Sequence, residues 1–166
     1  MWFTLQAVTP DYAARAPGTL KYEFVIDASP ERVFAILSDI EQWPKWFPDM
    51  RSVVWHSPPS ERNRVGARRE VDTKSSKLIE HFIAWEENKR MAFYAEAMSV
   101  PLAREFMEDY RLEAHGEGQT KMTWLVHYRL RLFLRPFDGL VRIKFGGMFE
   151  SATKALQAYV IRTAGA

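Results

Sequence analysis

The chain has 166 residues, a length that supports one domain with a single core and is short for two. Hydrophobic residues make up 47% of it and charged residues 27%, which excludes a disordered or fibrous protein. The net charge of +2 arises from interspersed cations and anions, and there is no cysteine. We therefore expect no nucleic-acid partner, no disulfide and no cysteine-based zinc site.

The N-terminus MWFTLQAVTPDYAAR lacks the basic start of a secretory signal, and its apolar run is short. No segment approaches the roughly 20 apolar residues that a transmembrane helix needs. The simplest expectation is a cytoplasmic protein without a transmembrane segment.

Residues 1–19 have no clear periodicity and contain proline and glycine, so we interpret them as an N-terminal arm before a single domain at 20–166. The arm carries Trp2, Phe3 and Leu5, which would be unusual in a free tail. They would pack on the domain's own surface or cover a partner subunit, so a homodimer is one candidate assembly.

The domain begins with a predicted strand over residues 20–28. Ser29 then suits a helix N-cap and Pro30 the first helical position, which predicts a helix to about Asp39. The next stretch, EQWPKWFPDM at 41–50, is rich in aromatic residues. Each proline in it follows an aromatic residue and favours extended backbone at Trp43 and Phe47.

The rest of the chain alternates strand patterns with turn signals until a final helix pattern. Strands are predicted at residues 50–57, 67–73, 77–86, 89–97, 103–114 and 120–131, with a polar loop over 58–66. The glycines of HGEGQ suit a tight turn between the last two strands. Residues 136–163 then repeat apolar side chains every three or four positions, from Phe137 and Leu140 to Val160, which predicts one long amphipathic helix interrupted by Gly146 and Gly147.

The segment SPERVFAILSDIEQWPKWFP, at residues 29–48, resembles the START-like or Bet v 1-like (SRPBCC) superfamily, in particular its polyketide cyclase/dehydrase and lipid-transport branch. The strand-turn-strand AWEENKRMAFY and the closing helix are similar to the same family. The resemblance implies an α+β helix-grip fold, in which a curved seven-stranded antiparallel sheet wraps around a long C-terminal helix. Two short helices would follow the first strand, and an elongated apolar cavity would lie between the sheet and the long helix.

Alternation along the last two strands predicts their register. In both strands the even-numbered positions are the more apolar, so these should face inward. Tyr110 would then lie opposite Trp124, and Phe106 opposite Tyr128. Glu108 would point inward among aromatic side chains.

Glu108 is the most informative residue, because a carboxylate in an apolar pocket has a raised pKa unless it is paired, and such groups are enriched at functional sites. It would act as a general acid or base or hold a ligand hydroxyl; otherwise it lies near the cavity mouth or bonds to a tyrosine or arginine. Arg69, His81 and Tyr128 are candidate partners. His81 is uncertain in position, since either face of residues 78–86 could point inward.

The four histidines have no metal-ligand spacing, and the sequence has no nucleotide-binding glycine motif and no GxSxG. We therefore expect no metal site and no cofactor.

The leading hypothesis is a carrier or binding protein for a hydrophobic small molecule of the polyketide, lipid or isoprenoid/aromatic type. The expected ligand-binding residues are Trp43, Phe47, Arg69, Phe93, Phe106, Tyr110, Trp124, Tyr128, Phe145 and Phe149. The first alternative is a polyketide cyclase or dehydrase in which Glu108, with His81 or Tyr128, moves protons. The second alternative is a module that binds a protein partner or a membrane through the arm.

Overall fold

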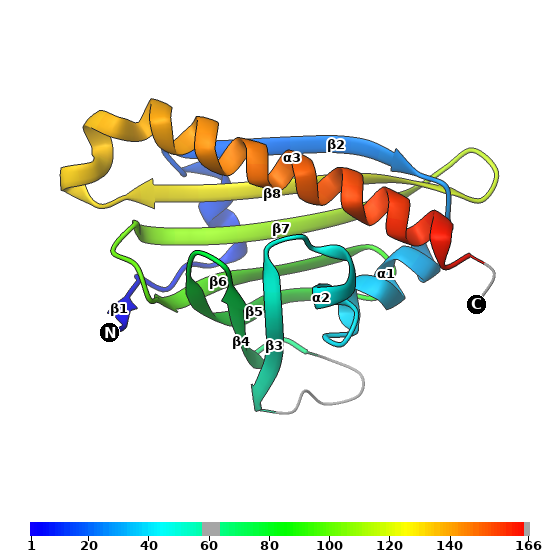
Figure 1. The fold of residues 1–166 in the computed structure, drawn as a ribbon, viewed down its shortest axis with the longest axis horizontal. Helices are drawn as coiled ribbons and strands as arrows, with labels where there is room; N and C mark the ends of the chain where they lie inside the picture. Colours follow the sequence, from blue (N-terminus) through cyan, green and yellow to red (C-terminus); the bar gives the residue numbers. More distant parts are fainter. Residues whose placement is uncertain (58–63, 165–166) are drawn as a thin grey trace.

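The computed structural model describes residues 1–57 and 64–164. Most of the polar loop expected over 58–66 lies outside the described residues. The described chain forms one antiparallel sheet with a long helix along one of its faces (Figure 1). This is the helix-grip arrangement expected from the sequence.

The sheet follows the order β2-β8-β7-β6-β5-β4-β3, with the short strand β1 pairing with β6. Its strands are β1 (Phe3–Thr4), β2 (Gly18–Ile26), β3 (Met50–Ser57), β4 (Arg68–Thr73), β5 (Lys77–Glu86), β6 (Arg90–Met98), β7 (Ala103–His115) and β8 (Gln119–Leu130). The helices are η1 (Pro10–Ala14), α1 (Pro30–Ser38), α2 (Trp43–Trp46), η2 (Leu132–Phe137) and α3 (Asp138–Arg162). All neighbouring strands in this order pair antiparallel.

The two short helices lie between β2 and β3 and cover one end of the sheet (Figure 1). Ser29 caps α1, since its side-chain oxygen accepts a hydrogen bond from the Arg32 backbone N–H. The extended backbone expected at Phe47 is confirmed, but the same expectation for Trp43 is wrong. Trp43 begins α2, because Pro44 falls in the first turn of that helix, where a missing N–H costs nothing.

The N-terminal arm packs on the domain's own sheet. Phe3 and Thr4 pair with the end of β6, beyond the part of β6 that pairs with β7. The Leu5 N–H then donates to a carbonyl of β6, and the Gln6 N–H to a carbonyl of β7. The arm therefore fills the gap where β6 and β7 separate, which accounts for the burial of Leu5.

The predicted register of β7 and β8 is confirmed. Tyr110 pairs with Trp124, and Phe106 pairs with Tyr128. The intervening turn uses Gly116 and Gly118 with φ of 56° and 72°, a backbone conformation that glycine adopts without steric cost. The inward set of each strand consequently shares one face of the sheet with Glu108.

The structure also settles which face of β5 points inward. Leu78, Glu80 and Phe82 face the core, whereas His81 lies on the other face and stacks on Tyr94, with 5.2 Å between ring centroids. An irregularity in the pairing after Phe82 then brings Trp85, rather than Ala84, against the core residues Phe34 and Phe82. The even-numbered alternative is therefore right from Leu78 to Phe82 and wrong for Ala84.

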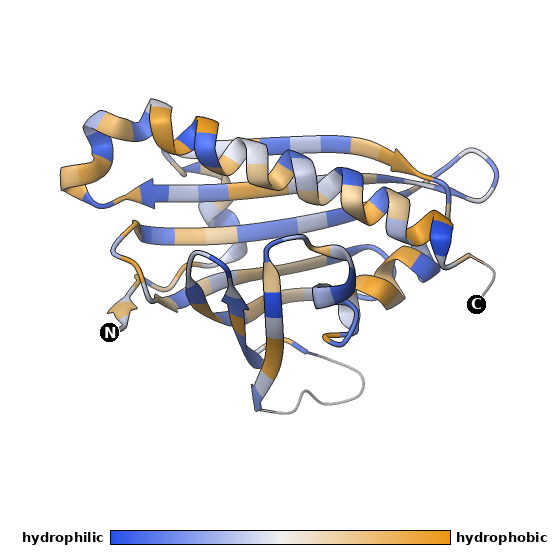
Figure 2. Ribbon diagram, viewed as in Figure 1, coloured by the Kyte–Doolittle hydropathy of each residue, from blue (hydrophilic) through white to orange (hydrophobic). Residues whose placement is uncertain are grey.

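The long helix is continuous through Gly146 and Gly147, but its predicted apolar face is only partly buried. The fully buried residues of α3 begin at Phe149, and Phe137 and Leu140 are exposed, contrary to the buried face that the pattern suggests. Figure 2 shows hydrophobic residues continuing through η2 and the start of α3. The N-terminal half of α3 has an apolar surface that the sheet does not cover.

Candidate functional site

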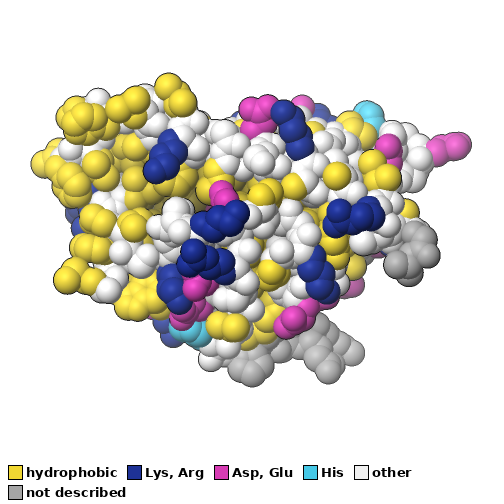
Figure 3. Space-filling view, in the orientation of Figure 1, with side chains coloured by type: hydrophobic (Ala, Val, Ile, Leu, Met, Phe, Trp, Pro, Cys, Tyr) yellow, Lys and Arg dark blue, Asp and Glu magenta, His cyan; other side chains and the backbone are white. Residues whose placement is uncertain are grey.

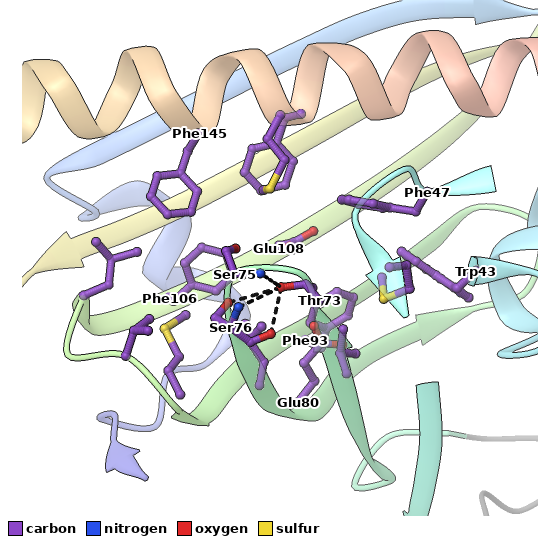
Figure 4. Close-up of a pocket in the computed structure, with 18 of the residues that line it drawn as sticks. Trp43, Phe47, Thr73, Ser75, Ser76, Glu80, Phe93, Phe106, Glu108 and Phe145 are labelled. Atoms are coloured by element: carbon purple, nitrogen blue, oxygen red, sulfur yellow. Dashed lines mark hydrogen bonds between the residues drawn. The ribbon is translucent and has the colours of Figure 1, made fainter. Parts of the chain in front are cut away.

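A cavity lies between the sheet and α3, with a volume of about 60 Å³. Its walls are predominantly apolar and come from α2, five strands, the loop between β6 and β7 and the middle of α3 (Figure 4). The lining residues are Trp43, Phe47, Met50, Arg69, Val71, Thr73, Ser75, Ser76, Leu78, Glu80, Phe93, Met98, Val100, Leu102, Phe106, Glu108, Tyr110, Phe145, Met148 and Phe149. Most of the residues that the sequence proposed as ligand contacts thus surround one space.

An outer groove of about 550 Å³ adjoins the cavity. Six residues line both spaces: Ser75, Ser76, Val100, Leu102, Phe145 and Met148. In Figure 4, Phe145 points from α3 into the cavity, while Phe47 and Trp43 approach from the opposite end. The groove and the cavity are therefore adjacent, and the side chains between them are largely apolar.

Glu108 is held in the cavity wall by two hydrogen bonds to the same oxygen. Its Oε2 accepts from the Tyr110 hydroxyl at 2.5 Å and from the Trp124 indole N–H at 2.9 Å. Within the described residues, Oε1 makes no hydrogen bond. The side chain is thus oriented by one oxygen, and the other is available to a bound molecule.

Burial, and to a lesser extent the nearby carboxylate of Glu80, raise the pKa of Glu108 to about 7, although the bonds from Tyr110 and Trp124 and the charge of Arg69 act in the opposite direction. A group with this pKa changes protonation near neutral pH. It can donate a hydrogen bond or a proton below that pH and accept one above it.

A buried ion pair, formed by Arg69 and Glu80, also lines the cavity. The Arg69 Nε donates to Glu80 at 2.6 Å, and both side chains are almost completely buried. The guanidinium also lies over the rings of Trp43, at 4.5 Å, and Phe93, at 4.8 Å. Burial raises the pKa of Glu80, and Arg69 opposes this effect.

The tryptophans of the 41–50 stretch have different surroundings. Trp43 lines the cavity and donates its indole N–H to the Leu37 carbonyl at 2.8 Å, and Phe47 lines the cavity beside it. Trp46 is buried against Trp43 and Phe47 but does not belong to the cavity wall.

The turn between β4 and β5 forms part of the cavity mouth. The Thr73 hydroxyl accepts from the backbone N–H groups of Ser75 and Ser76 and donates to the Ser76 carbonyl at 2.7 Å (Figure 4). These bonds fix the turn, and with it the two serines that both spaces share.

Three residues proposed from the sequence do not line this cavity. His81 is on the outer face of β5, because its neighbours Glu80 and Phe82 face inward. Tyr128 lies in a small adjoining space and donates to Asp138 at 2.9 Å, and its pKa is raised to about 12 by burial. Trp124 does not line the cavity, but its indole N–H donates a hydrogen bond to Glu108, which does.

Other residues of the site were not identified from the sequence. Glu80 is the most important, and its signal was weak because both faces of its strand contain three apolar residues and one polar residue. Leu78 and Met98 belong to the apolar walls, and only strand alternation could have indicated them. Among the described residues, no group of three or more His, Cys, Asp or Glu side chains could hold a metal ion.

This fold and cavity define a START-like helix-grip domain. The sequence profile of the family described as polyketide cyclase / dehydrase and lipid transport matches residues 17–160, and the chain belongs to that family. An uncharacterised protein of Mycobacterium tuberculosis is 30% identical over 135 residues, which cover 81% of this chain and 79% of that protein.

Solved structures share the fold at low identity. A START superfamily protein from Mycobacterium smegmatis superposes with a TM-score of 0.73 at 18% identity, covering 87% of this chain and 97% of that one. The aromatase/cyclase ZhuI from Streptomyces gives a TM-score of 0.70 at 13% identity, covering 89% and 98%. The di-domain aromatase/cyclase BexL gives 0.74 at 17% identity, and the match covers 90% of this chain and 48% of BexL. No helix in the described part of the chain is long and apolar enough to cross a membrane.

Proposed function

We propose that this protein binds a hydrophobic small molecule of the polyketide, lipid or isoprenoid/aromatic type in the cavity and acts as its carrier. The observation that carries the proposal is the position of Glu108, an oriented carboxyl group with one unbonded oxygen in a predominantly apolar wall that also contains the Arg69–Glu80 ion pair. Ligand sites commonly combine apolar walls with a few placed polar groups. Glu108 would hold the polar end of the ligand.

The volumes indicate how such a ligand would lie. Drug-sized ligands occupy pockets of about 300–1,000 Å³. The inner cavity of about 60 Å³ admits only a small end group, whereas the groove of about 550 Å³ admits a ring system or chain. The ligand would therefore place its polar end beside Glu108 and its apolar body in the groove.

The charge state of Glu108 restricts the polar end. Below its pKa of about 7 the neutral carboxyl group donates a hydrogen bond to a carbonyl or hydroxyl oxygen, and above it the carboxylate repels an anion. The ligand should therefore end in a carbonyl or hydroxyl group.

Binding of the fluorescent apolar probe 1-aminoanthracene tests the location. Val100, which lines both spaces, is changed to tryptophan to obstruct the route between them, and Val54 on β3 provides a control that lines neither. Val100→Trp should weaken binding by at least about tenfold, corresponding to about 1.4 kcal/mol. Val54→Trp should bind as the unaltered protein does. Equal affinity in all three proteins would place the probe elsewhere.

Mass spectrometry of the intact protein under non-denaturing conditions, followed by solvent extraction, would identify a molecule that copurifies. A small apolar compound present with the unaltered protein and absent from Val100→Trp would define the ligand class. The proposal involves no nucleic acid and no cofactor. It keeps the cytoplasmic location expected from the sequence, which cell fractionation would test.

An enzymatic role is the second candidate, and the pKa of Glu108 favours it. General acid–base catalysis works best when the pKa of the catalytic group is near the operating pH, and Glu108 has a pKa of about 7. It would then move protons on a poly-β-ketone held in the cavity, as in a cyclase or dehydrase. Glu108→Gln separates the two roles. A carrier keeps most of its affinity for 1-aminoanthracene, whereas an enzyme still binds a synthetic poly-β-ketone thioester but no longer turns it over.

A further inference from the structure

A patch of five large apolar side chains is exposed on η2 and the first half of α3. These residues, which we call the apolar cap, are Leu132, Phe133, Phe137, Leu140 and Ile143, and each is between 53% and 75% exposed. Figure 3 shows hydrophobic side chains gathered at this end of the molecule, at the upper left. Contiguous exposed apolar surface of this kind marks an interaction site.

The apolar cap adjoins the entrance to the ligand site. Phe133 and Leu140 form part of the groove wall, together with Phe145 and Met148, which also line the inner cavity. Apolar surface is therefore continuous from the exposed cap to the cavity. Whatever covers the cap also faces the route by which a ligand enters.

Cationic side chains flank the cap. Residues 131–144 contain four cations, Arg131, Arg135, Arg142 and Lys144, and one anion, Asp138. Arg142 is paired with Asp138 at 2.7 Å. Arg131 instead donates to the Thr4 carbonyl and lies over the Phe3 ring of the N-terminal arm. Within the described chain Arg135 and Lys144 form no ion pair, so these two cations give the cap a positive rim.

We propose that the apolar cap docks on the surface of an anionic phospholipid membrane. Amphipathic segments with Phe and Leu on one side and Lys or Arg beside them lie in the membrane interface, held by apolar insertion and by attraction to anionic lipids. A second copy of this chain fits less well, because a symmetric contact would bring like-charged rims together. Given the proposed carrier function, docking turns the groove toward the bilayer, so that a ligand transfers without crossing water.

Co-sedimentation with vesicles free of ligand tests the docking. Phe137 and Ile143 line neither the cavity nor the groove, so Phe137→Ser/Ile143→Ser alters the cap alone. Ile161→Ser is the matched control, since Ile161 is exposed at the other end of α3. On phosphatidylcholine vesicles with phosphatidylserine, the double variant should bind at least about tenfold more weakly than the unaltered protein. The control should bind normally.

The charged rim has its own test. Lys144→Gln should weaken binding to the anionic vesicles by roughly fivefold, and pure phosphatidylcholine vesicles should bind the unaltered protein more weakly than the mixed vesicles. No vesicle binding by the unaltered protein, or equal binding by the double variant, would overturn the proposal. A dimer in light scattering that dissociates in the double variant, without vesicle binding, would assign the cap to a second copy instead.

The failure of docking and the failure of ligand binding are distinguishable. The double variant leaves every cavity and groove residue in place, so it should bind 1-aminoanthracene in vesicle-free solution as the unaltered protein does. Probe binding without vesicle binding would refute only the docking. Vesicle binding without probe binding would refute only the proposed carrier function.

Discussion

Replacing Glu108 with glutamine should make the stability of the protein less dependent on pH. In the folded protein, burial and the charge of Glu80 raise the pKa of Glu108 from 4.5 to about 7. A carboxyl group with a raised pKa holds its proton longer in the folded state than in the unfolded state. Below about pH 4.5 the group is protonated in both states and does not affect the unfolding free energy. Between pH 4.5 and about 7 only the unfolded chain loses the proton, so the unfolding free energy falls, and above about pH 7 the loss is complete.

The size of the effect follows from the two pKa values. The difference between 4.5 and about 7 corresponds to a loss of about 3 kcal/mol of unfolding free energy in the unaltered protein between pH 4 and pH 8. The glutamine side chain does not titrate, and its oxygen still accepts hydrogen bonds from Tyr110 and Trp124. Glu108→Gln should therefore be about as stable as the unaltered protein at low pH and more stable at pH 8.

Urea denaturation at intervals between pH 4 and pH 8 measures this difference. Glu113→Gln is the control, because Glu113 is an exposed residue of the same strand. Only the Glu108 variant should gain stability relative to the unaltered protein as the pH rises. If the unfolding free energies of the unaltered protein and Glu108→Gln changed with pH in parallel, the pKa of Glu108 would not be raised in the folded protein, and the reasoning would be refuted.

Three further substitutions test other parts of the account. Glu80→Gln leaves the buried guanidinium of Arg69 without a counter-charge and should cost about 3–5 kcal/mol in urea denaturation; a loss below about 1 kcal/mol would contradict the buried pair. Trp43→Phe and Trp46→Phe should both lower the melting temperature, but only Trp43→Phe should change the affinity for 1-aminoanthracene, because only Trp43 lines the cavity. Gly147→Ala should stabilise the protein by up to about 1 kcal/mol, since nothing lies within 4 Å of the added methyl group; destabilisation would refute this.

The sequence predicted those features that depend on local periodicity. The pairing of Tyr110 with Trp124 followed from two long strands whose apolar residues alternate and whose turn allows one register. The inward direction of Glu108 followed from the same alternation. Burial of one face makes register strongly determined, so this part of the site was predictable.

The features that depend on which strands meet could not be predicted. Arg69 and Glu80 are paired residues of adjacent strands, but the pattern of β5 fits either face equally well, and His81 was an equal candidate. The partners of Glu108 are likewise set by packing. Tyr110, two residues away on the same strand, donates to it, whereas Arg69, His81 and Tyr128 do not.

The long helix shows a different limit. Its apolar spacing extends through Phe137 and Leu140, but periodicity alone does not say where the covering sheet ends. The sheet covers α3 fully only from Phe149, so the same pattern yields core at one end and exposed surface at the other.

A crystal structure of the protein soaked with 1-aminoanthracene tests the central claim most directly. We expect the fused rings in the groove, between Leu102 and Phe145, with the amino group directed into the cavity toward the unbonded Oε1 of Glu108. An empty cavity with the probe bound at another surface would contradict the claim that this space is the ligand site.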